Sequence, residues 1–313
     1  MKNGGGHGRQ DTKNGAWEIL RGGKLPKGLV DRLAGISRGQ LEAQAQEDGI
    51  GGQMAHFLAD AQGRREPIPS DPRSRKAQAG LLALHGRLGK QKLALPQVLG
   101  VAGGLTAGRI VMTVVPPYDF ALTIKNPSSS GSFGPAIVDA TAVKAGTLSA
   151  SAISTQQRSM GSAFAQMGIF FHPLSAGRLR VSAAPTFSFQ RWTNSLGAAE
   201  VRSFGAADLV IHGLEQRPTE PGDFGIVSSA ASPFVRWDET TPGEVRFDAR
   251  FDQQGQVSAE LAVSRSLVYL VTLTVSCAVR TVGWPGSLAG AKLSAGVPSI
   301  TWEFQPDLLQ TRD

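Results

Sequence analysis

The sequence predicts an α+β protein in which the two kinds of element are segregated. A basic N-terminal helical region precedes an antiparallel β-sandwich or jelly-roll domain. The spacing of apolar residues is helical before Pro96 and alternates with a period of two after it. No strand candidate after Pro96 is followed by a helical pattern, which argues against a doubly wound α/β fold. We therefore divide the chain into a flexible lead at 1–24, a helical region at 25–95 and a sandwich at 96–313.

The lead is glycine-rich and lacks the apolar core of a cleaved secretory signal. We expect a chain that is cytoplasmic at synthesis or exported without a cleaved signal. The sequence contains no run of about 18 apolar residues, so it predicts no membrane-spanning helix. The clearest helix of the next region starts at the N-cap Asp71 with Pro72 in the first turn, and Leu81, Leu84 and Leu88 share one face.

The net charge of +7 lies entirely in the first third of the chain. Residues 1–95 hold 16 of the 32 Lys and Arg but only 9 of the 25 Asp and Glu. A basic arm on a neutral body favours docking to a polyanion or an acidic partner, or an ordinary solvated helical region. The anion-binding candidates are Arg73, Arg75, Lys76 and Arg87.

Short alternating segments separated by Gly, Pro, Asn and Asp predict the strands of the sandwich. In 244–251, for example, Val245, Phe247 and Phe251 alternate with charged residues, which predicts one face against the core and one in solvent. The Ser-, Thr- and Gly-rich stretch 126–161 predicts two thin strands and a long loop at a sheet edge. The strand candidates are 109–115, 119–125, 163–171, 177–183, 186–192, 208–213, 244–251, 256–263, 267–281 and 299–304.

Residues with catalytic or metal-binding potential form no recognisable motif. No two of the five histidines stand close together in the sequence, and no nucleophile elbow or phosphate loop is present. The carboxylates of an acidic loop with His212, Glu215, Glu220 and Asp223 suit calcium, but their spacing matches no defined calcium loop. The single Cys277 lies on the apolar face of a strand and is expected to be a buried, inert thiol. We predict no cofactor and no metal, and favour a protein that is not an enzyme.

A repeated Phe-x-Arg-Trp pattern supplies the candidate binding residues. It places Trp192 and Trp237 on the opposite strand face from their Phe and Arg neighbours, so we expect outward tryptophans that stack on a sugar or anchor a protein. A second layer covering both tryptophans is the alternative. The candidate ligand-binding residues are Trp192, Arg191, Asn194, Trp237, Arg236 and Trp284.

These patterns favour a non-enzymatic recognition or structural protein that binds a glycan or a protein surface, with the basic arm used for docking or assembly. A homo-oligomer fits this interpretation. The first alternative is a capsid-like shell subunit whose basic arm faces nucleic acid, by analogy of layout alone. The second is a pore-forming or toxin-like protein that uses the stretch 126–161.

Overall fold

The computed structural model describes residues 17–19, 83, 87, 90, 109–127, 133–173, 175–195, 200–216, 224–242, 245–282 and 286–307. The expected helical region at 25–95, with Arg73, Arg75 and Lys76, lies outside these residues except for three isolated positions. Arg87 is one of these three and is exposed. No helix in the described part of the chain has the length and hydrophobicity needed to cross a membrane.

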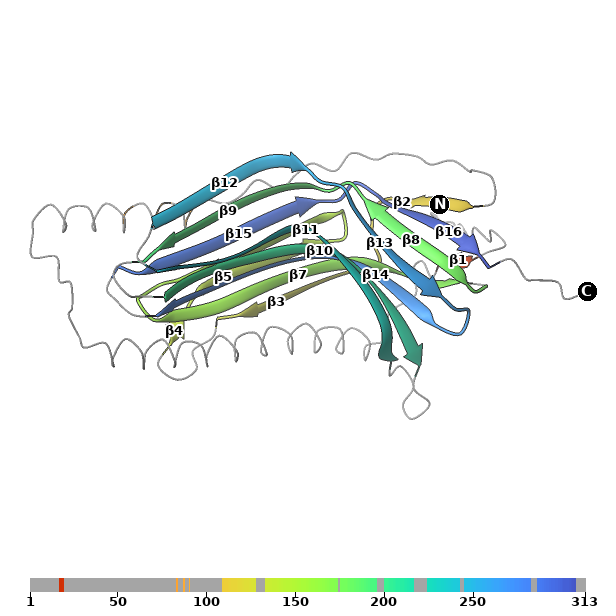
Figure 1. Ribbon diagram of the computed structural model, residues 1–313, viewed down its shortest axis with the longest axis horizontal. Helices are drawn as coiled ribbons and strands as arrows, with labels where there is room; N and C mark the ends of the chain where they lie inside the picture. The colour runs from red at the N-terminus through yellow and green to blue at the C-terminus, as the bar shows by residue number, and fades with distance from the viewer. Residues whose placement is uncertain are drawn as a thin grey trace, which may run out of the picture.

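One layer of the sandwich is a seven-stranded sheet built on long strands (Figure 1). Its order is β1-β7-β14-β10-β11, and β3 and β4 also pair with β7. Its pairs are antiparallel apart from β4 with β7. The strands are β1 (Trp17–Ile19), β3 (Phe120–Asn126), β4 (Gly134–Pro135), β7 (Ser159–Pro173), β10 (Glu200–Gln216), β11 (Phe224–Pro242) and β14 (Val268–Val282).

The other layer consists of two smaller antiparallel sheets (Figure 1). The five-stranded sheet has the order β12-β9-β15-β6-β5, and the four-stranded sheet has the order β13-β8-β16-β2. The first contains β12 (Val245–Gln254), β9 (Thr186–Asn194), β15 (Leu288–Gly296), β6 (Thr147–Ile153) and β5 (Ile137–Val143). The second contains β13 (Val257–Val263), β8 (Gly177–Ala183), β16 (Ile300–Pro306) and β2 (Ile110–Val114).

Three short connections join the two smaller sheets along a seam. The chain passes from β8 to β9 at Ala184 and Pro185, from β12 to β13 at Gly255 and Gln256, and from β15 to β16 at 297–299. The amide of Gly255 donates a hydrogen bond to the carbonyl of Pro185 at 2.9 Å, which ties two of the connections together. The seam is therefore a fixed bend in the outer surface.

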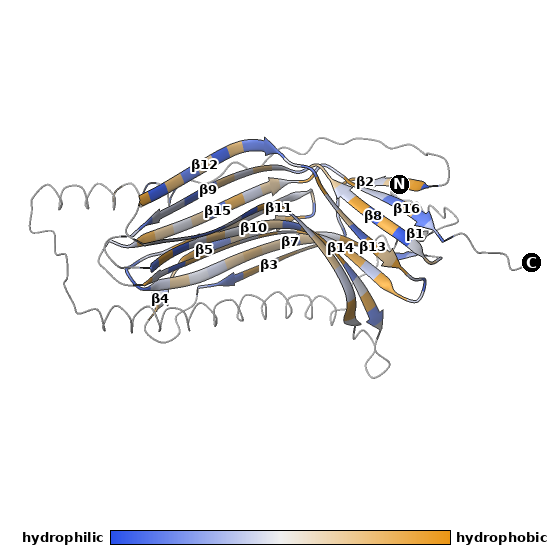
Figure 2. Ribbon diagram, in the orientation of Figure 1, coloured by the Kyte–Doolittle hydropathy of each residue, from blue (hydrophilic) through white to orange (hydrophobic). Residues whose placement is uncertain are grey.

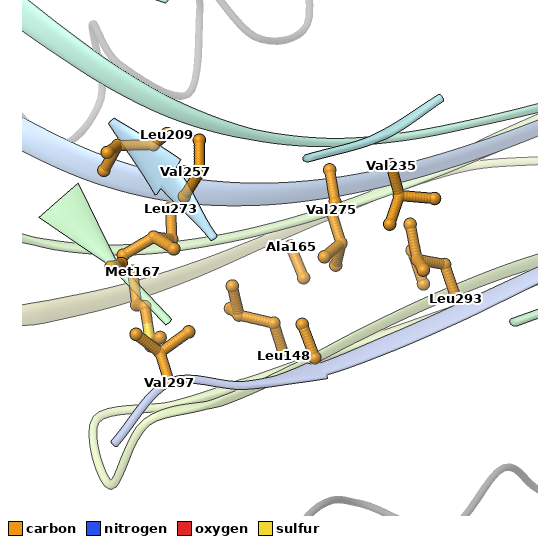
Figure 3. Packing of buried hydrophobic residues seen from close by; sticks show 14 of the residues in the cluster. Leu148, Ala165, Met167, Leu209, Val235, Val257, Leu273, Val275, Leu293 and Val297 are labelled. Carbon is orange, nitrogen blue, oxygen red and sulfur yellow. The ribbon is translucent and has the colours of Figure 1, made fainter. Parts of the chain in front are cut away.

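A single apolar cluster fills the space between the layers and continues under both smaller sheets. Figure 3 shows Leu148 and Leu293 facing Val275 and Ala165 across this interior. Cys277 belongs to the cluster with 0% exposure, and burial raises the pKa of its thiol. The expected buried thiol is thus confirmed. Side chains at alternate strand positions supply the cluster, as a two-layer β fold requires.

The predicted β-sandwich is confirmed for the described residues, whereas the predicted helical region lies outside them. Each strand candidate overlaps an observed strand, and the hairpin of β5 and β6 lies at a sheet edge as expected for the stretch 126–161. Strands β1, β4, β11 and β15 were not predicted, and β1 lies within the expected flexible lead at 1–24. Every residue of β15 is buried, and its apolar positions are mostly alanines that alternate with glycine, lysine and serine, so the apolar signal of this strand is weak.

The predicted orientation of β12 is wrong. Its apolar side chains Val245, Phe247 and Phe251 are 55%, 54% and 49% exposed. Its inward side instead carries Asp248, which accepts a bond from Arg191 Nη2 at 3.1 Å. Because ion pairs occupy the rim of the interior here, the strand turns its apolar face away from the core.

Candidate functional site

The two tryptophans of the repeated pattern are buried, with exposures of 5% for Trp192 and 6% for Trp237. The expectation that they are outward and accessible is therefore wrong. Each indole lies over a glycine directly opposite on the neighbouring strand, Trp192 over Gly290 and Trp237 over Gly205. A Cβ at either glycine would overlap the indole, so the repeated pattern marks two Trp–Gly cross-strand pairs rather than two binding tips.

Trp237 lies in the main core and links the two layers. Its Nε1 donates to Ser203 Oγ at 3.3 Å, and that hydroxyl donates to the carbonyl of Gly290 at 3.0 Å. The ring of Phe189 lies 5.2 Å from the indole. Trp192 instead lies on the outer side of the five-stranded sheet, with Lys292 Nζ 6.0 Å from its ring centroid. The two tryptophans therefore do not form one site.

The remaining predicted ligand-binding residues do not converge either. Arg191 is held by Asp248 at 3.1 Å and Glu239 at 3.7 Å, which makes it part of the rim network between the layers. Asn194 is 5% exposed and donates from Nδ2 to the carbonyl of Gly286 at 2.8 Å. Arg236 is exposed on β11, and Trp284 lies outside the described residues.

A polar hollow of about 470 Å³ lies on the outer surface along the seam, and this is the candidate site. The four-stranded sheet supplies one wall and the connections between the smaller sheets supply the other. A second hollow of about 200 Å³ continues from it over the same sheet, and Arg180 and Glu303 line both. Together they form one open groove across β13, β8, β16 and β2, the four-stranded sheet at the right of Figure 1.

A row of hydroxyl groups crosses the whole four-stranded sheet on the groove side. Ser258 pairs with Ser182, Ser182 with Thr301, and Thr301 with Thr113. The hydroxyls of Thr113 and Thr301 are 3.3 Å apart, and Ser182 Oγ donates to the carbonyl of Thr301 at 3.5 Å. Each hydroxyl both donates and accepts, so this row suits a ligand that is itself rich in hydroxyls.

A row of charged groups lies beside the hydroxyl row. Arg180 on β8 stands between Glu260 on β13 and Glu303 on β16. Both carboxylates already contact other cations: Glu260 lies 3.4 Å from Arg178, and Glu303 lies 3.9 Å from Arg109. Arg180 makes no ion pair with any residue that the structure describes. Its exposed guanidinium therefore lies in the middle of the groove with its fork of N–H donors open.

Sequence reasoning missed this groove, although a signal for it exists. Arg178, Arg180 and Ser182 alternate with buried residues along β8, which identifies them as one exposed strand face. The alternation does not reveal which strands lie alongside, so the approach of Glu303 and Thr301 requires the sheet order. The hollow itself requires the bend at the seam.

Other candidate chemistry does not assemble in the described part of the chain. No three His, Cys, Asp or Glu side chains there could share a metal ion. His212 and Glu215 lie on β10, whereas Glu220 and Asp223 fall outside the described ranges. Burial lowers the pKa of His212, and its buried Nδ1 has no hydrogen-bond partner among the residues that the structure describes.

No protein-family model matches the chain, and no curated protein matches it. Among solved structures, the enzymatically active domain of bacteriophage CBA120 tailspike protein 4 gives a TM-score of 0.16 at 10% identity, covering 61% of this chain and 19% of that one. The VP2 subviral particle of infectious bursal disease virus gives 0.15 at 12%, covering 70% and 48%. The chain thus spans less than half the length of these structures, and scores this low do not establish a shared fold.

Proposed function

We propose that the protein is a non-enzymatic recognition protein that binds an acidic glycan in the groove of the four-stranded sheet. The observation that carries this proposal is the exposed Arg180 beside a row of hydroxyl groups. A sugar carboxylate accepts two parallel bonds from a guanidinium, and ring hydroxyls exchange hydrogen bonds with Ser and Thr. The first hollow of the groove, about 470 Å³, is of the size that small ligands occupy.

The local charge favours an acidic saccharide over a neutral one. Arg109, Arg178 and Arg180 outnumber Glu260 and Glu303 along the groove. Because the two glutamates contact Arg109 and Arg178, the charge of Arg180 is the one left for a ligand. Hydrogen bonds to charged groups contribute about 1.5–3 kcal/mol, so we expect Arg180→Ala to weaken binding by roughly 10- to 150-fold.

The test is calorimetric titration of the full chain with glucuronic acid oligosaccharides and with glucose oligosaccharides of the same length. We expect tighter binding of the acidic series, loss of that preference in Arg180→Ala, and partial retention in Arg180→Lys. Arg265→Ala is the matched control, because Arg265 is exposed in a turn outside the groove. Equal binding of both series, or equal losses in Arg180→Ala and Arg265→Ala, would contradict the proposal.

The shell-subunit and pore-forming hypotheses stay untested predictions. Docking of the basic arm to a polyanion also stays a prediction, because Arg73, Arg75 and Lys76 lie outside the described residues. None of these hypotheses shares residues with the groove. A result on the groove therefore does not decide them.

A further inference from the structure

Strand β12 forms an exposed edge of the five-stranded sheet. It pairs with β9 on one side, and no strand of the described ranges pairs with the other side. Figure 1 shows it along the upper border of the sandwich, and Figure 2 shows polar and apolar residues alternating along it. Phe247 and Phe251 are 54% and 49% exposed. An edge strand with exposed apolar side chains is a template for pairing with another strand.

The residue order of β12 is complementary to itself. In an antiparallel pair centred on Ala249, residues equally far before and after Ala249 lie opposite each other. Asp248 then faces Arg250 of the second copy. Phe247 and Arg246 come next to Phe251 and Asp252, which lie in the bulged part of the strand. Opposite charges and aromatic pairs directly across two strands stabilise their pairing.

Neighbouring alignments of the same two strands bring like charges together. Moving the centre by one residue toward the N-terminus places Asp248 opposite Asp248 and Arg246 opposite Arg250. Moving it by one residue toward the C-terminus places Arg250 opposite Arg250 and Asp248 opposite Asp252. Half-step shifts place a charged residue opposite a phenylalanine, Arg250 opposite Phe247 in one direction and Asp248 opposite Phe251 in the other. Like charges opposite each other destabilise a pair. One-residue shifts are therefore disfavoured. A two-residue shift to a centre at Phe247 again places Arg246 opposite Asp248, and the cysteine test below separates that alignment from the one centred on Ala249.

We propose that two copies of the chain dimerise through β12, in antiparallel pairing about a two-fold axis at Ala249. A two-fold axis makes each contact occur twice, which is the usual form of a homodimer interface. A β-bulge after Arg250, with a φ of 50° at Asp252, bends the strand beyond its centre. The pairs of Asp248 with Arg250 and of Ala249 with Ala249 lie on the regular part of the strand in both copies. This inference is independent of the ligand proposed for the groove.

The test uses a cysteine on the proposed axis of the full chain. Opposite Cα atoms of an antiparallel pair lie about 4.5–5.5 Å apart, within the range that a disulfide spans. Ala249→Cys should therefore form a disulfide-linked dimer under mild oxidation. Cys277 is fully buried, so the introduced thiol is the reactive one among the described residues. Arg246→Cys is the control, because its two thiols would lie about 20 Å apart in the proposed alignment.

Non-reducing electrophoresis and light scattering read out the result. We expect Ala249→Cys to link more than tenfold faster than Arg246→Cys. Equal linkage of Ala249→Cys and Arg246→Cys, or no linkage of either, would overturn the proposal. A wild-type chain that light scattering finds monomeric at about 100 μM would also overturn the proposal, because we expect the β12 dimer to be populated at that concentration.

A charge exchange tests the alignment without a covalent bond. Arg250→Asp alone places Asp opposite Asp248, and Asp248→Arg alone places Arg opposite Arg250, so both variants should be monomeric. A mixture of the two restores opposite charges in both central pairs and should dimerise again. Thermal unfolding of each variant checks its fold, because Asp248→Arg also loses the contact with Arg191. A mixture that stays monomeric while both variants are folded would contradict the alignment.

Discussion

Because the indole of Trp237 lies over Gly205, we expect Gly205→Ala to destabilise the protein strongly although it adds only one methyl group. Gly205 lies opposite Trp237 in the antiparallel pair of β10 and β11. A Cβ added at Gly205 would overlap three atoms of the indole, with Trp237 Cε2 only 2.6 Å away. Real Cβ contacts are not that short, so Gly205→Ala must displace the indole or separate the two strands.

The cost follows from what the indole holds in place. Overpacking of a filled core costs about 1–3 kcal/mol. A displaced Trp237 also loses its bond to Ser203 Oγ, worth about 1 kcal/mol, and its contact with Phe189, worth about 0.5–1.5 kcal/mol. Replacing a glycine restricts the unfolded chain and returns about 0.4–1 kcal/mol. The net expectation is a loss of about 2–5 kcal/mol in the free energy of unfolding.

Chemical denaturation monitored by tryptophan fluorescence measures this loss. Gly255→Ala is the matched control, because a Cβ there would lie 3.3 Å from Phe187 and meet nothing closer. Its effect should stay within about 1 kcal/mol of wild type. A double-mutant cycle with Trp237→Leu isolates the overlap, since removing the indole should remove most of the cost of Gly205→Ala. A neutral Gly205→Ala, or a cost unchanged in the Trp237→Leu background, would refute the reasoning.

Two further predictions concern buried titratable groups. Burial lowers the pKa of His212 below the ordinary value of 6.5, so the unfolded chain binds a proton at a pH where folded His212 stays neutral. Stability should therefore fall as the pH drops below about 6.5, and His212→Gln should flatten that slope in denaturation series at several pH values. An unchanged slope would contradict this. Burial raises the pKa of Cys277, so a thiol reagent at about pH 8 should label it only after unfolding, as absorbance would show.

Alternation in the sequence predicts where strands occur, because each strand needs only its own residues to show it. The range of β8 is predicted without error and that of β14 within one residue. Strand β15 escapes this reasoning although Ala289, Ala291 and Leu293 alternate with Gly290, Lys292 and Ser294. Its side chains are mostly small, and both of its faces are covered, so its period of two is weak.

The groove of the four-stranded sheet could not be predicted from the sequence, because its residues come from different strands. Arg180 and Thr301 are far apart in the sequence and meet only because β8 and β16 pair. The sequence predicts ligand binding at Trp192 and Trp237 because large aromatic side chains beside turns often bind ligands. What the sequence does not show is that Gly290 and Gly205 lie opposite them, leaving space in which each indole can lie flat on its sheet. The glycines opposite Trp237 and Trp192 thus leave the space in which the two buried indoles fit.

The contacts that turn the apolar face of β12 outward also explain why its edge is available for the proposed dimer. Alternation gives a strand two faces, but the neighbours decide which face turns inward. Arg191 on β9 and Glu239 on β11 already lie at this rim, and an inward Phe247 would leave both without the contacts that Asp248 and Arg246 provide. Among the described residues, Arg191 and Glu239 would then keep only their mutual contact of 3.7 Å, whereas apolar side chains at an edge are tolerated in solvent. The strand therefore exposes its phenylalanines, and pairing with a second β12 covers the edge that this orientation leaves open.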